Sequence, residues 1–441
     1  MRSTVVTHDD RNLTRAIGLL PATSMVVGII VGASIFVQPS LIAARTGSAS
    51  AVATAWLAAG LLTLAGALVA AELASAFPRS GGVYVFLKEA WSPAAGFTWG
   101  WAMLWTMHSG IIAAIAVVFA RYLARLAPLE GTAVQATAIT AVAVLTTVNV
   151  IGVRAGARVQ SSLTVLKVAL VVGLAAVLLF APAPTHTSAA TAVSAWDWAL
   201  AVGAGLFAFG GWHMVTYAAE ETVDAARTIP RALAIGVAIV TACYLALNAA
   251  YLRVLPLEAL AASRSVAADA VAAVAGARGA TVVALVVAIS ALGALNGVVL
   301  AGPRVYYAMA ADGLAFRWLA GVHGRFHTPH RALILQGLVA SALIATGTYE
   351  QLFGRVIYTE WLFFALMAIG LVRLRGRPGY APPWRMPAAP YLPLLFALAS
   401  LAVAARQIAV APLDSAIGLA IAASGIPIYF MWIKFRKRSS P

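Results

Sequence analysis

Two glycine-containing interruptions of apolar segments carry the clearest chemical signal in this sequence. The first lies at Gly28 and Gly32, and the second lies about 180 residues later at Gly210 and Gly211. Glycine destabilises a helix by about 1 kcal/mol relative to alanine, and unpaired backbone groups in lipid are tolerated only where they line a protein cavity. Interrupted segments at matching positions in two halves of a chain are the best sequence indication of a transporter's substrate site.

A helix that is broken inside a membrane exposes N–H groups at one new end, which attract an anion, and carbonyl groups at the other, which attract a cation. An amino-acid zwitterion carries one charge of each sign. Two glycines four residues apart, such as Gly28 and Gly32, can also be present only to allow close helix packing. Two interruptions at equivalent places nevertheless favour a binding site. The predicted contacts are N–H groups near Ala33, Ser34 and Ile35, beside Gly32, for a carboxylate, and carbonyls near Ile30, Phe207 and Gly210 for an ammonium group.

Lys167 is the second chemical signal, because it lies about ten residues into an apolar segment, roughly 15 Å deep at about 1.5 Å per residue. A lysine at that depth costs at least about 2.5–3.5 kcal/mol unless it is paired. Its stem would barely reach the interface by snorkelling. We therefore expect its ammonium group to dock on freed carbonyls of the first helix, where a coupling sodium ion would otherwise bind, with the Tyr244 hydroxyl as a neighbour.

Composition indicates that membrane helices position these residues. The chain has 441 residues, of which 62% are hydrophobic and only 10% are charged, whereas a soluble domain carries about 25% charged residues. Apolar stretches of about 20 residues, each long enough to cross the hydrocarbon core, recur along the chain. The sequence predicts an all-α polytopic membrane protein with about twelve spans, at residues 17–40, 50–76, 93–124, 133–151, 157–181, 197–222, 230–254, 279–311, 331–348, 351–373, 389–408 and 413–433.

The interrupted segments open two five-span blocks, at residues 17–181 and 197–373, and two further helices over 389–433 complete a single transmembrane domain. Because five is odd, the second block enters the membrane from the opposite side, as in inverted-topology repeats. The span count and the paired interruptions support this repeat, since sequence identity between the halves is too weak to see.

The net charge of +15 lies mostly on one side of the predicted spans. An even number of spans puts both termini on that side, which holds Arg79, Lys88 and the tail from Lys434 to Arg438, whereas fewer basic residues, such as Arg45 and Arg253, lie opposite. The positive-inside rule therefore predicts cytoplasmic termini. The basic excess is a topology signal, with anionic-lipid contact as an addition, and nucleic acid is not an expected partner.

Several motifs together make the sequence similar to the amino acid–polyamine–organocation superfamily, over about residues 12–410. The tract from Leu206 through Tyr251 most resembles the L-type amino-acid transporter branch and its bacterial relatives. The motifs are Gly-x-x-x-Gly-Ala-Ser-Ile-Phe-x-x-Pro ending at Pro39, Ala71-Glu72-Leu73 followed by Pro78 to Tyr84, Leu206 to Trp212 followed by Glu220-Glu221, Pro230-Arg231-Ala232, and Asn296-Gly297 through Arg304.

This resemblance implies the LeuT-type fold, with discontinuous first and sixth helices, and sodium-independent exchange or uptake of amino acids by alternating access. It implies that Lys167 occupies the sodium position and that Phe207 closes over the substrate from outside. Trp212 would lie just beyond the second break, and His213 would help to shape the side-chain pocket. No cofactor is implied.

The sequence departs from the family pattern in two places. Gly32-Ala33-Ser34 replaces the usual Gly-Ser-Gly, so carboxylate binding would depend more on the backbone and on the Ser34 hydroxyl. His213 stands where asparagine is common; a neutral imidazole suits neutral or aromatic substrates, and a charged one would repel cations. The one cysteine, Cys243, falls inside a span, which argues against the disulfide-linked heavy chain of animal L-type transporters.

Other ionisable residues within or near spans are weaker candidates. Glu72 and Glu360 could relay protons or pair with an amine, but we favour carboxyls satisfied by local donors at span ends. We interpret His108 as a hydrogen-bonded packing residue. The histidines of one predicted cytoplasmic loop lack cysteine or acidic neighbours, so no metal site is expected; they are His323, His327 and His330.

The leading hypothesis is a bacterial inner-membrane permease for neutral L-amino acids, sodium-independent and working as an exchanger or as a proton-linked carrier. A polyamine or cationic amino-acid carrier is the alternative; it needs an acidic side chain facing the pocket, and the sequence suggests none near either break. A membrane haem protein needs histidines paired across helices, and only His108 and His213 fall in spans. A non-transporting amino-acid sensor would bind a ligand in the same pocket without moving it.

Overall fold

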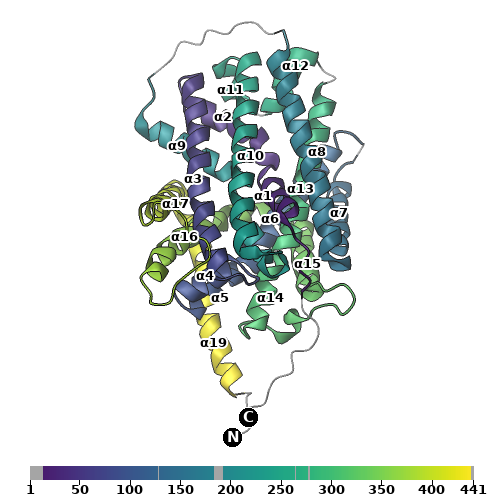
Figure 1. Ribbon diagram of the computed structural model, residues 1–441. Helices are drawn as coiled ribbons and strands as arrows, with labels where there is room; N and C mark the ends of the chain where they lie inside the picture. The colour runs from purple at the N-terminus through teal and green to yellow at the C-terminus, as the bar shows by residue number, and fades with distance from the viewer. Residues whose placement is uncertain (1–12, 128, 183–191, 264, 277–278, 439–441) are drawn as a thin grey trace.

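The computed structural model describes residues 13–127, 129–182, 192–263, 265–276 and 279–438. Secondary structure in these ranges is helical, apart from an isolated β-bridge between Ile17 and Thr222. Figure 1 shows an elongated bundle in which most of the long helices run close to the long axis.

Several helices begin at a proline or a capping serine and end at a glycine or before a proline. In chain order the helical elements are α1 (Leu19–Ile30), η1 (Ala33–Phe36), α2 (Gln38–Ala43), α3 (Ala49–Ala76), α4 (Val83–Ala90), α5 (Pro93–Ala102), η2 (Met103–Met107), α6 (His108–Leu123), α7 (Thr132–Ile151), α8 (Val153–Phe180), α9 (Ala195–Ala208), η3 (Trp212–Glu221), α10 (Ala225–Val254), α11 (Leu257–Ala262), α12 (Val266–Ala275), α13 (Gly279–Ala301), α14 (Pro303–Ala311), η5 (Arg317–Ala320), α15 (His330–Thr346), α16 (Tyr349–Arg375), α17 (Tyr391–Val410), α18 (Pro412–Ala423) and α19 (Gly425–Arg438). The longest described connection joins α16 to α17 over residues 376–390.

Nine helical segments of the described chain are long and apolar enough to cross a membrane. Their outward faces stay apolar: on α8, Val165 and Val172 are more than half exposed. Exposure of such an apolar surface is unfavourable in water but not in lipid. The chain is therefore a multi-pass membrane protein.

Most predicted spans correspond to these segments, with differences at their interiors. The span predicted at 279–311 is divided at Gly302 into α13 and α14, and the one at 413–433 is divided into α18 and α19. The span at 93–124 contains the π-helical turn η2. The predicted segments outside the nine correspond to the interrupted α1–η1–α2 and to α15 and α16.

The centre of the bundle holds α1 between α8, α10 and α13, while α3 lies along α10. Gly28 allows α1 to approach α8 closely, because a Cβ there would lie 2.1 Å from the Gln160 Nε2 atom. The Thr164 hydroxyl then donates to the Ser24 carbonyl at 2.9 Å. These contacts anchor the first half of α1, so the chain beyond Ile30 can leave the helix without loosening its start.

One end of the bundle, the lower end in Figure 1, is closed by polar contacts. The Arg304 guanidinium group donates to the Glu221 carboxylate, with Nε at 2.6 Å, and both side chains are fully buried. The N–H groups of Ala16 and Ile17 donate to the Glu221 carbonyl, both at 2.9 Å. The lead-in to α1 is thus held against the end of η3.

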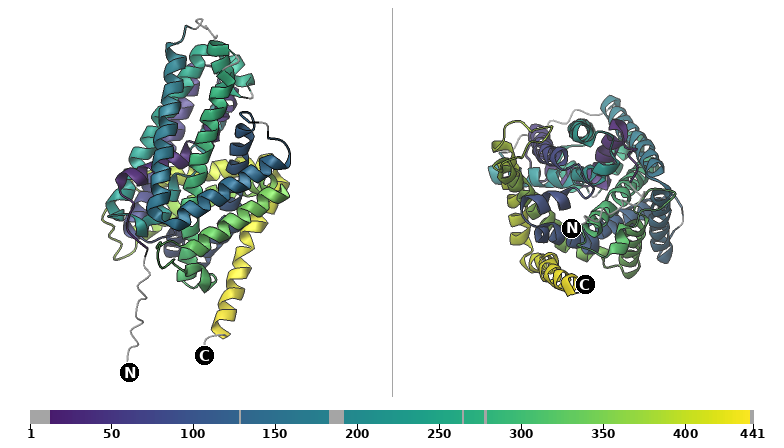
Figure 2. Two further views of the ribbon diagram at one scale, coloured as in Figure 1. Left: turned by 90° about the vertical axis from the view of Figure 1, so that its right-hand side faces the viewer. Right: turned by 60° about the horizontal axis from the view of Figure 1, so that its bottom comes forward.

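At the same end, Tyr84 and Lys88 donate to the Asp312 carboxylate at 2.6 Å and 2.5 Å. Burial, and the Asp312 carboxylate that accepts its hydrogen bond, raise the pKa of the Tyr84 hydroxyl, which therefore stays a donor. The Arg436 guanidinium group reaches the Gly313 carbonyl at 3.2 Å. Figure 2 shows α19, in yellow, leaving the bundle at this end, so the first and last described helices are tied to one face of the molecule.

Candidate functional site

The first interruption separates α1 from η1. The helix ends at Ile30, Val31 has a non-helical ψ of 81°, and Gly32 is extended, with φ −112° and ψ −151°. No side chain caps the start of η1 at Gly32. Because the first N–H groups of a helix have no partner in a preceding turn, those of Ala33 and Ser34 form a small patch of donors.

The second interruption separates α9 from η3. The helix ends at Ala208, and Gly211 has a φ of +94°, which favours glycine. A Cβ on Gly211 would also lie 2.4 Å from Ile29 Cγ2, so this glycine lets the two interruptions touch. By contrast, a Cβ on Gly32 would meet its nearest neighbour, Ala294 Cβ, at 3.7 Å. Gly28 therefore serves packing, whereas Gly32 lies at the break itself.

Polar side chains hold the two interruptions together. The Tyr244 hydroxyl lies 3.1 Å from the Ile30 carbonyl and 3.2 Å from the Ala208 carbonyl, and it can donate to either. The Ser34 hydroxyl lies 3.4 Å from the same Ala208 carbonyl. The freed carbonyls of one helix thus face the other break.

Lys167, on α8, is fully buried against the first interruption. Its ammonium group donates to the carbonyls of Gly28 and Val31, both at 2.7 Å, and to that of Ser290 on α13 at 2.9 Å. These three acceptors match the three donors of an ammonium group. The arrangement links α1, α8 and α13 around one fixed positive charge.

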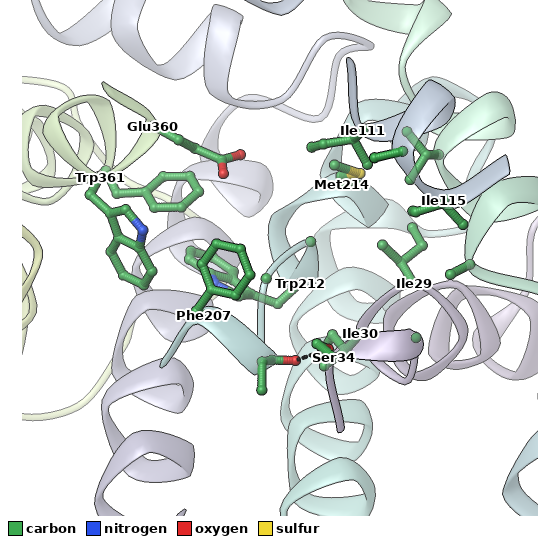
Figure 3. Close-up of a pocket in the computed structure, with 18 residues that line it drawn as sticks. Ile29, Ile30, Ser34, Ile111, Ile115, Phe207, Trp212, Met214, Glu360 and Trp361 are labelled. Carbon is green, nitrogen blue, oxygen red and sulfur yellow. Dashed lines mark hydrogen bonds between the residues drawn. The ribbon is translucent and has the colours of Figure 1, made fainter. Parts of the chain in front are cut away.

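A cavity of about 210 Å³ lies beside the two interruptions. Figure 3 shows Ile29, Ile111, Ile115 and Met214 on one side of it and Phe207, Trp361 and Glu360 on the other, with Ser34 and Ile30 at the bottom. The lining is mostly apolar, so the two breaks and Glu360 supply its polar character. The lining residues are Ile29, Ile30, Gly32, Ser34, Ile111, Ala114, Ile115, Phe207, Ala208, Gly210, Gly211, Trp212, Met214, Ala294, Val298, Glu360, Trp361 and Phe364.

Most predicted substrate contacts lie at this cavity. Six of them line it: Ile30, Gly32, Ser34, Phe207, Gly210 and Trp212. Ala33 contributes backbone at the start of η1. Phe207, in the last turn of α9, is 42% exposed and stands partly open beside the cavity.

Besides Ala33, two further predicted contacts are not among the lining residues. Ile35 is fully buried in the hydrophobic core. His213 is also fully buried and lies behind the cavity, where its ring meets Trp99, Tyr217 and Phe364. Because η3 is a tight 3₁₀ helix, the side chain after Trp212 points away from the lining, so the expectation that His213 shapes the pocket directly is corrected.

Glu360 corrects the sequence interpretation further. The expected span-end carboxyl with local donors is instead nearly fully buried, lines the cavity, and has no hydrogen-bond partner for its Oε1 atom among the described residues. An acidic side chain therefore does face the pocket. The signal in the sequence was a glutamate inside an apolar segment, but nothing local relates α16 to the breaks.

Two other candidates have structural partners. The Arg375 guanidinium group pairs with the Glu72 carboxylate, which also accepts the Met386 N–H at 2.8 Å. This carboxyl is satisfied at a span end, but its donors come from a distant part of the chain rather than from local residues. His108 Nδ1 lies 3.1 Å from the Tyr306 hydroxyl, as expected of a hydrogen-bonded packing residue. Sequence reasoning did not find the α6 and α13 lining, which consists of ordinary apolar residues.

The geometry suits a small zwitterion: N–H donors at the start of η1 can meet an anion, and carbonyls at the ends of α1 and α9 can meet a cation. Comparison with known proteins gives a family match over nearly the same residues, since a model described as "Amino acid permease" matches residues 17–432. The serine/threonine exchanger SteT of Bacillus subtilis (strain 168) is 30% identical, over 98% of this chain and 99% of its own length.

Two mammalian proteins show similar values. The cystine/glutamate transporter of Homo sapiens is 30% identical, over 97% of this chain and 87% of its own. The large neutral amino acids transporter small subunit 2 of Oryctolagus cuniculus is also 30% identical, over 97% and 82%.

Proposed function

This chain belongs to the amino acid permease family and is a membrane transporter rather than an enzyme, and we propose that it carries neutral L-amino acids without sodium, as an exchanger or as a proton-linked permease, by alternating access. The single observation that carries this proposal is the Lys167 ammonium group on three carbonyls beside the first break. Oxygen atoms of this kind are what a hard cation requires. A resident ammonium group uses them without any ion being bound.

The substrate's two charged ends fit the two interruptions. Its carboxylate binds the N–H groups of Ala33 and Ser34 together with the Ser34 hydroxyl, and its ammonium group binds carbonyls at the ends of α1 and α9. Some of these carbonyls already accept a protein hydrogen bond, as Ile30 does from Gly32, but a carbonyl has two lone pairs. Phe207 acts as the gate over this site.

Support for a neutral substrate comes from the lining and from relatives. The cavity wall of Ile29, Ile111 and Ile115 favours an uncharged side chain. The names of two relatives refer to serine/threonine and to large neutral amino acids. At 30% identity a relative's substrate does not transfer by itself, as the name of the cystine/glutamate transporter illustrates.

For the architecture we propose twelve spans in a LeuT-type arrangement, with inverted repeats at residues 17–181 and 197–373 and added helices over 389–433. The end that holds Lys88 and Arg436 is assigned to the cytoplasm, because basic residues gather there. Both termini then lie in the cytoplasm of a bacterial cell whose inner membrane contains the protein. The buried Arg304–Glu221 pair would then belong to the cytoplasmic end of the bundle.

The test is radiolabelled uptake into proteoliposomes with choline in place of sodium, with each of the twenty L-amino acids and common amines as competitors. We expect neutral amino acids to compete and sodium to have no effect. Uptake that requires sodium would refute the proposal for Lys167. Binding without any movement into the lumen would indicate a sensor instead.

Glu360 favours a second candidate, a carrier of cationic amino acids or polyamines, because a buried carboxylate at the cavity can pair with an amine. The same competition screen separates the two functions. If lysine, arginine or putrescine displaces the label better than any neutral amino acid, the second candidate replaces the first.

A further inference from the structure

We propose that a row of buried polar side chains moves protons between the substrate cavity and the end of the molecule at α14, so that transport is proton-linked. This buried polar chain consists of Glu360, His213, Tyr217, His108 and Tyr306. The inference rests on the proposed transport function and selects its proton-linked form. It assigns a role to side chains that substrate binding does not use.

The chain begins at the cavity with Glu360 and His213. Glu360 lines the cavity, and its Oε1 atom lies 3.4 Å from Nε2 of His213, which is fully buried behind it. Within the described residues, neither that oxygen nor either ring nitrogen of His213 has a hydrogen-bond partner. A carboxyl and an imidazole placed this way can hold one proton in either of two positions after a small movement that closes the remaining distance.

The chain continues through aromatic contacts toward α14. The His213 ring lies 5.5 Å from the Tyr217 ring, and the Tyr217 ring lies 5.5 Å from the His108 ring, measured between centroids. His108 Nδ1 lies 3.1 Å from the Tyr306 hydroxyl. Tyr306 belongs to α14, whose last residue precedes Asp312, the partially exposed acceptor of Tyr84 and Lys88.

Members of this row have unmet hydrogen-bonding capacity, a property that they share with other buried groups such as the Tyr251 hydroxyl but combine with adjacency to one another and to the cavity. The Tyr217 hydroxyl and His108 Nε2 are buried without a hydrogen-bond partner in the part of the chain that the structure describes. A buried polar atom left this way costs about 1–3 kcal/mol, and native proteins usually place water at such atoms. Water molecules between these groups would complete a continuous hydrogen-bonded path.

The local backbone is also unusual. The π-helical turn η2 ends directly before His108, and the Ser109 hydroxyl reaches back to the Leu104 carbonyl at 2.6 Å. π-Helical turns in α-helices are frequent at functional sites. The turn shifts the register of α6 and so contributes to where His108 faces.

Other titratable groups on the elements around Glu360 are already engaged. Glu72 pairs with Arg375, and Tyr84 and Lys88 donate hydrogen bonds to Asp312. On α15, α17 and α18, the described residues include no buried titratable side chain. A contact with an amine substrate would explain Glu360 alone and would leave the other members of the buried polar chain without a role.

Proton movement along the chain leaves its members unchanged. A proton from the cavity adds to the Glu360 carboxylate and forms the neutral acid. The new O–H bond then breaks as an N–H bond forms at Nε2 of His213, and the N–H bond at Nδ1 of the same ring breaks as that proton passes to water beside Tyr217. Water beside Tyr217 and His108 passes one proton onward for each one received, until one is released near Tyr306.

The experiment uses the full protein in sodium-free proteoliposomes with a pH-sensitive dye inside, and a mixture of the twenty radiolabelled L-amino acids as the probe. For the wild type, an external pH about two units below the internal pH should increase accumulation by up to about 100-fold at one proton per substrate. Each pH unit of difference corresponds to a tenfold ratio of proton activity. The dye should report acidification that depends on added amino acid.

His108→Gln and Tyr217→Phe test the chain away from the cavity, because neither residue lines it. Both should reduce gradient-driven accumulation and acidification by at least about tenfold, while exchange of label at equal pH continues. Tyr251→Phe is the matched control: this tyrosine is equally buried and its hydroxyl also lacks a described partner, but it lies near the far end of α10. It should leave both readouts unchanged.

The outcomes separate this inference from the proposed function. Label exchange without any response to the pH gradient in the wild type would overturn the proton chain and leave the transporter intact. Wild-type proton flux in both His108→Gln and Tyr217→Phe would also overturn it. The absence of all label movement in the wild type would instead refute the proposed transport function.

Discussion

Two buried ionisable groups near the cavity differ in how fully the surrounding residues satisfy their hydrogen-bonding capacity. The Lys167 ammonium group has three carbonyl acceptors for its three donors. The Glu360 carboxyl keeps an oxygen without a described partner, and the His213 ring nitrogen 3.4 Å from that oxygen is equally unsatisfied. A charged group whose hydrogen-bonding capacity is filled is held in one place, whereas a group with unfilled capacity is available to a ligand or a proton.

This difference suggests that Lys167 has a structural role and that Glu360 changes its protonation or its partner during transport. Lys167 joins three helices that must keep their relation while the substrate binds. Glu360 can change its protonation or its partner without breaking any protein hydrogen bond at Oε1. We therefore expect removal of Lys167 to stop the transport cycle and removal of the Glu360 charge to change what drives it.

The largest effect should follow Lys167→Ala, since it leaves three carbonyls without their donor and removes the fixed charge. We expect uptake to fall at least about 100-fold, the equivalent of roughly 2.7 kcal/mol, with expression less affected. Initial uptake rates in proteoliposomes, normalised to protein by immunoblot, measure this. Lys88→Ala, at the molecule's polar end, is the control; normal sodium-free uptake by Lys167→Ala would contradict the counter-ion role.

Glu360→Gln should have the next largest effect, because it retains the shape of the side chain but cannot release a proton. We expect gradient-driven accumulation to fall about tenfold and the pH dependence of uptake to flatten. Uptake measured across external pH values checks this. An unchanged pH profile combined with loss of competition by cationic amino acids would make Glu360 a substrate contact instead.

Phe207→Ala should weaken uptake through loss of the gate. The substitution removes a ring at the cavity mouth while both breaks stay in place, so we expect KM to rise by about tenfold with a smaller change in kcat. Phe180→Ala is a suitable control, because that ring is 87% exposed and does not line the cavity. Unchanged kinetics would remove Phe207 from the site.

Ser34→Ala should have the smallest effect of the series. The hydroxyl makes one long contact of 3.4 Å with the Ala208 carbonyl, and the neighbouring N–H groups remain. A single neutral hydrogen bond contributes about 0.5–1.5 kcal/mol, so KM should rise only a few-fold. A complete loss of uptake by folded protein would mean that the hydroxyl, rather than the backbone, dominates carboxylate binding.

Local sequence carried a large part of this description. Composition and segment length predicted a helical membrane protein, and glycines pointed to the two places where α1 and α9 end. Lys167 was recognisable because a mid-span lysine needs acceptors. The family resemblance also proved correct, since the chain matches the amino acid permease model over most of its length.

Distant packing was beyond that reasoning. The family resemblance implied that His213 shapes the pocket, but in the structure it lies behind the lining residues. Glu360 was judged by its position in a span and not by what faces that span. The relation of α16 to η3 depends on contacts between segments far apart in the chain, and no local pattern encodes it.

The sequence alone thus determined the membrane character, the places of the interruptions and the need of Lys167 for partners, because each follows from the free energy of one segment in lipid. Only the tertiary structure decided which side chains share the cavity and which buried polar atoms stay unsatisfied. Those properties depend on the mutual placement of several helices, so they arise when the bundle packs.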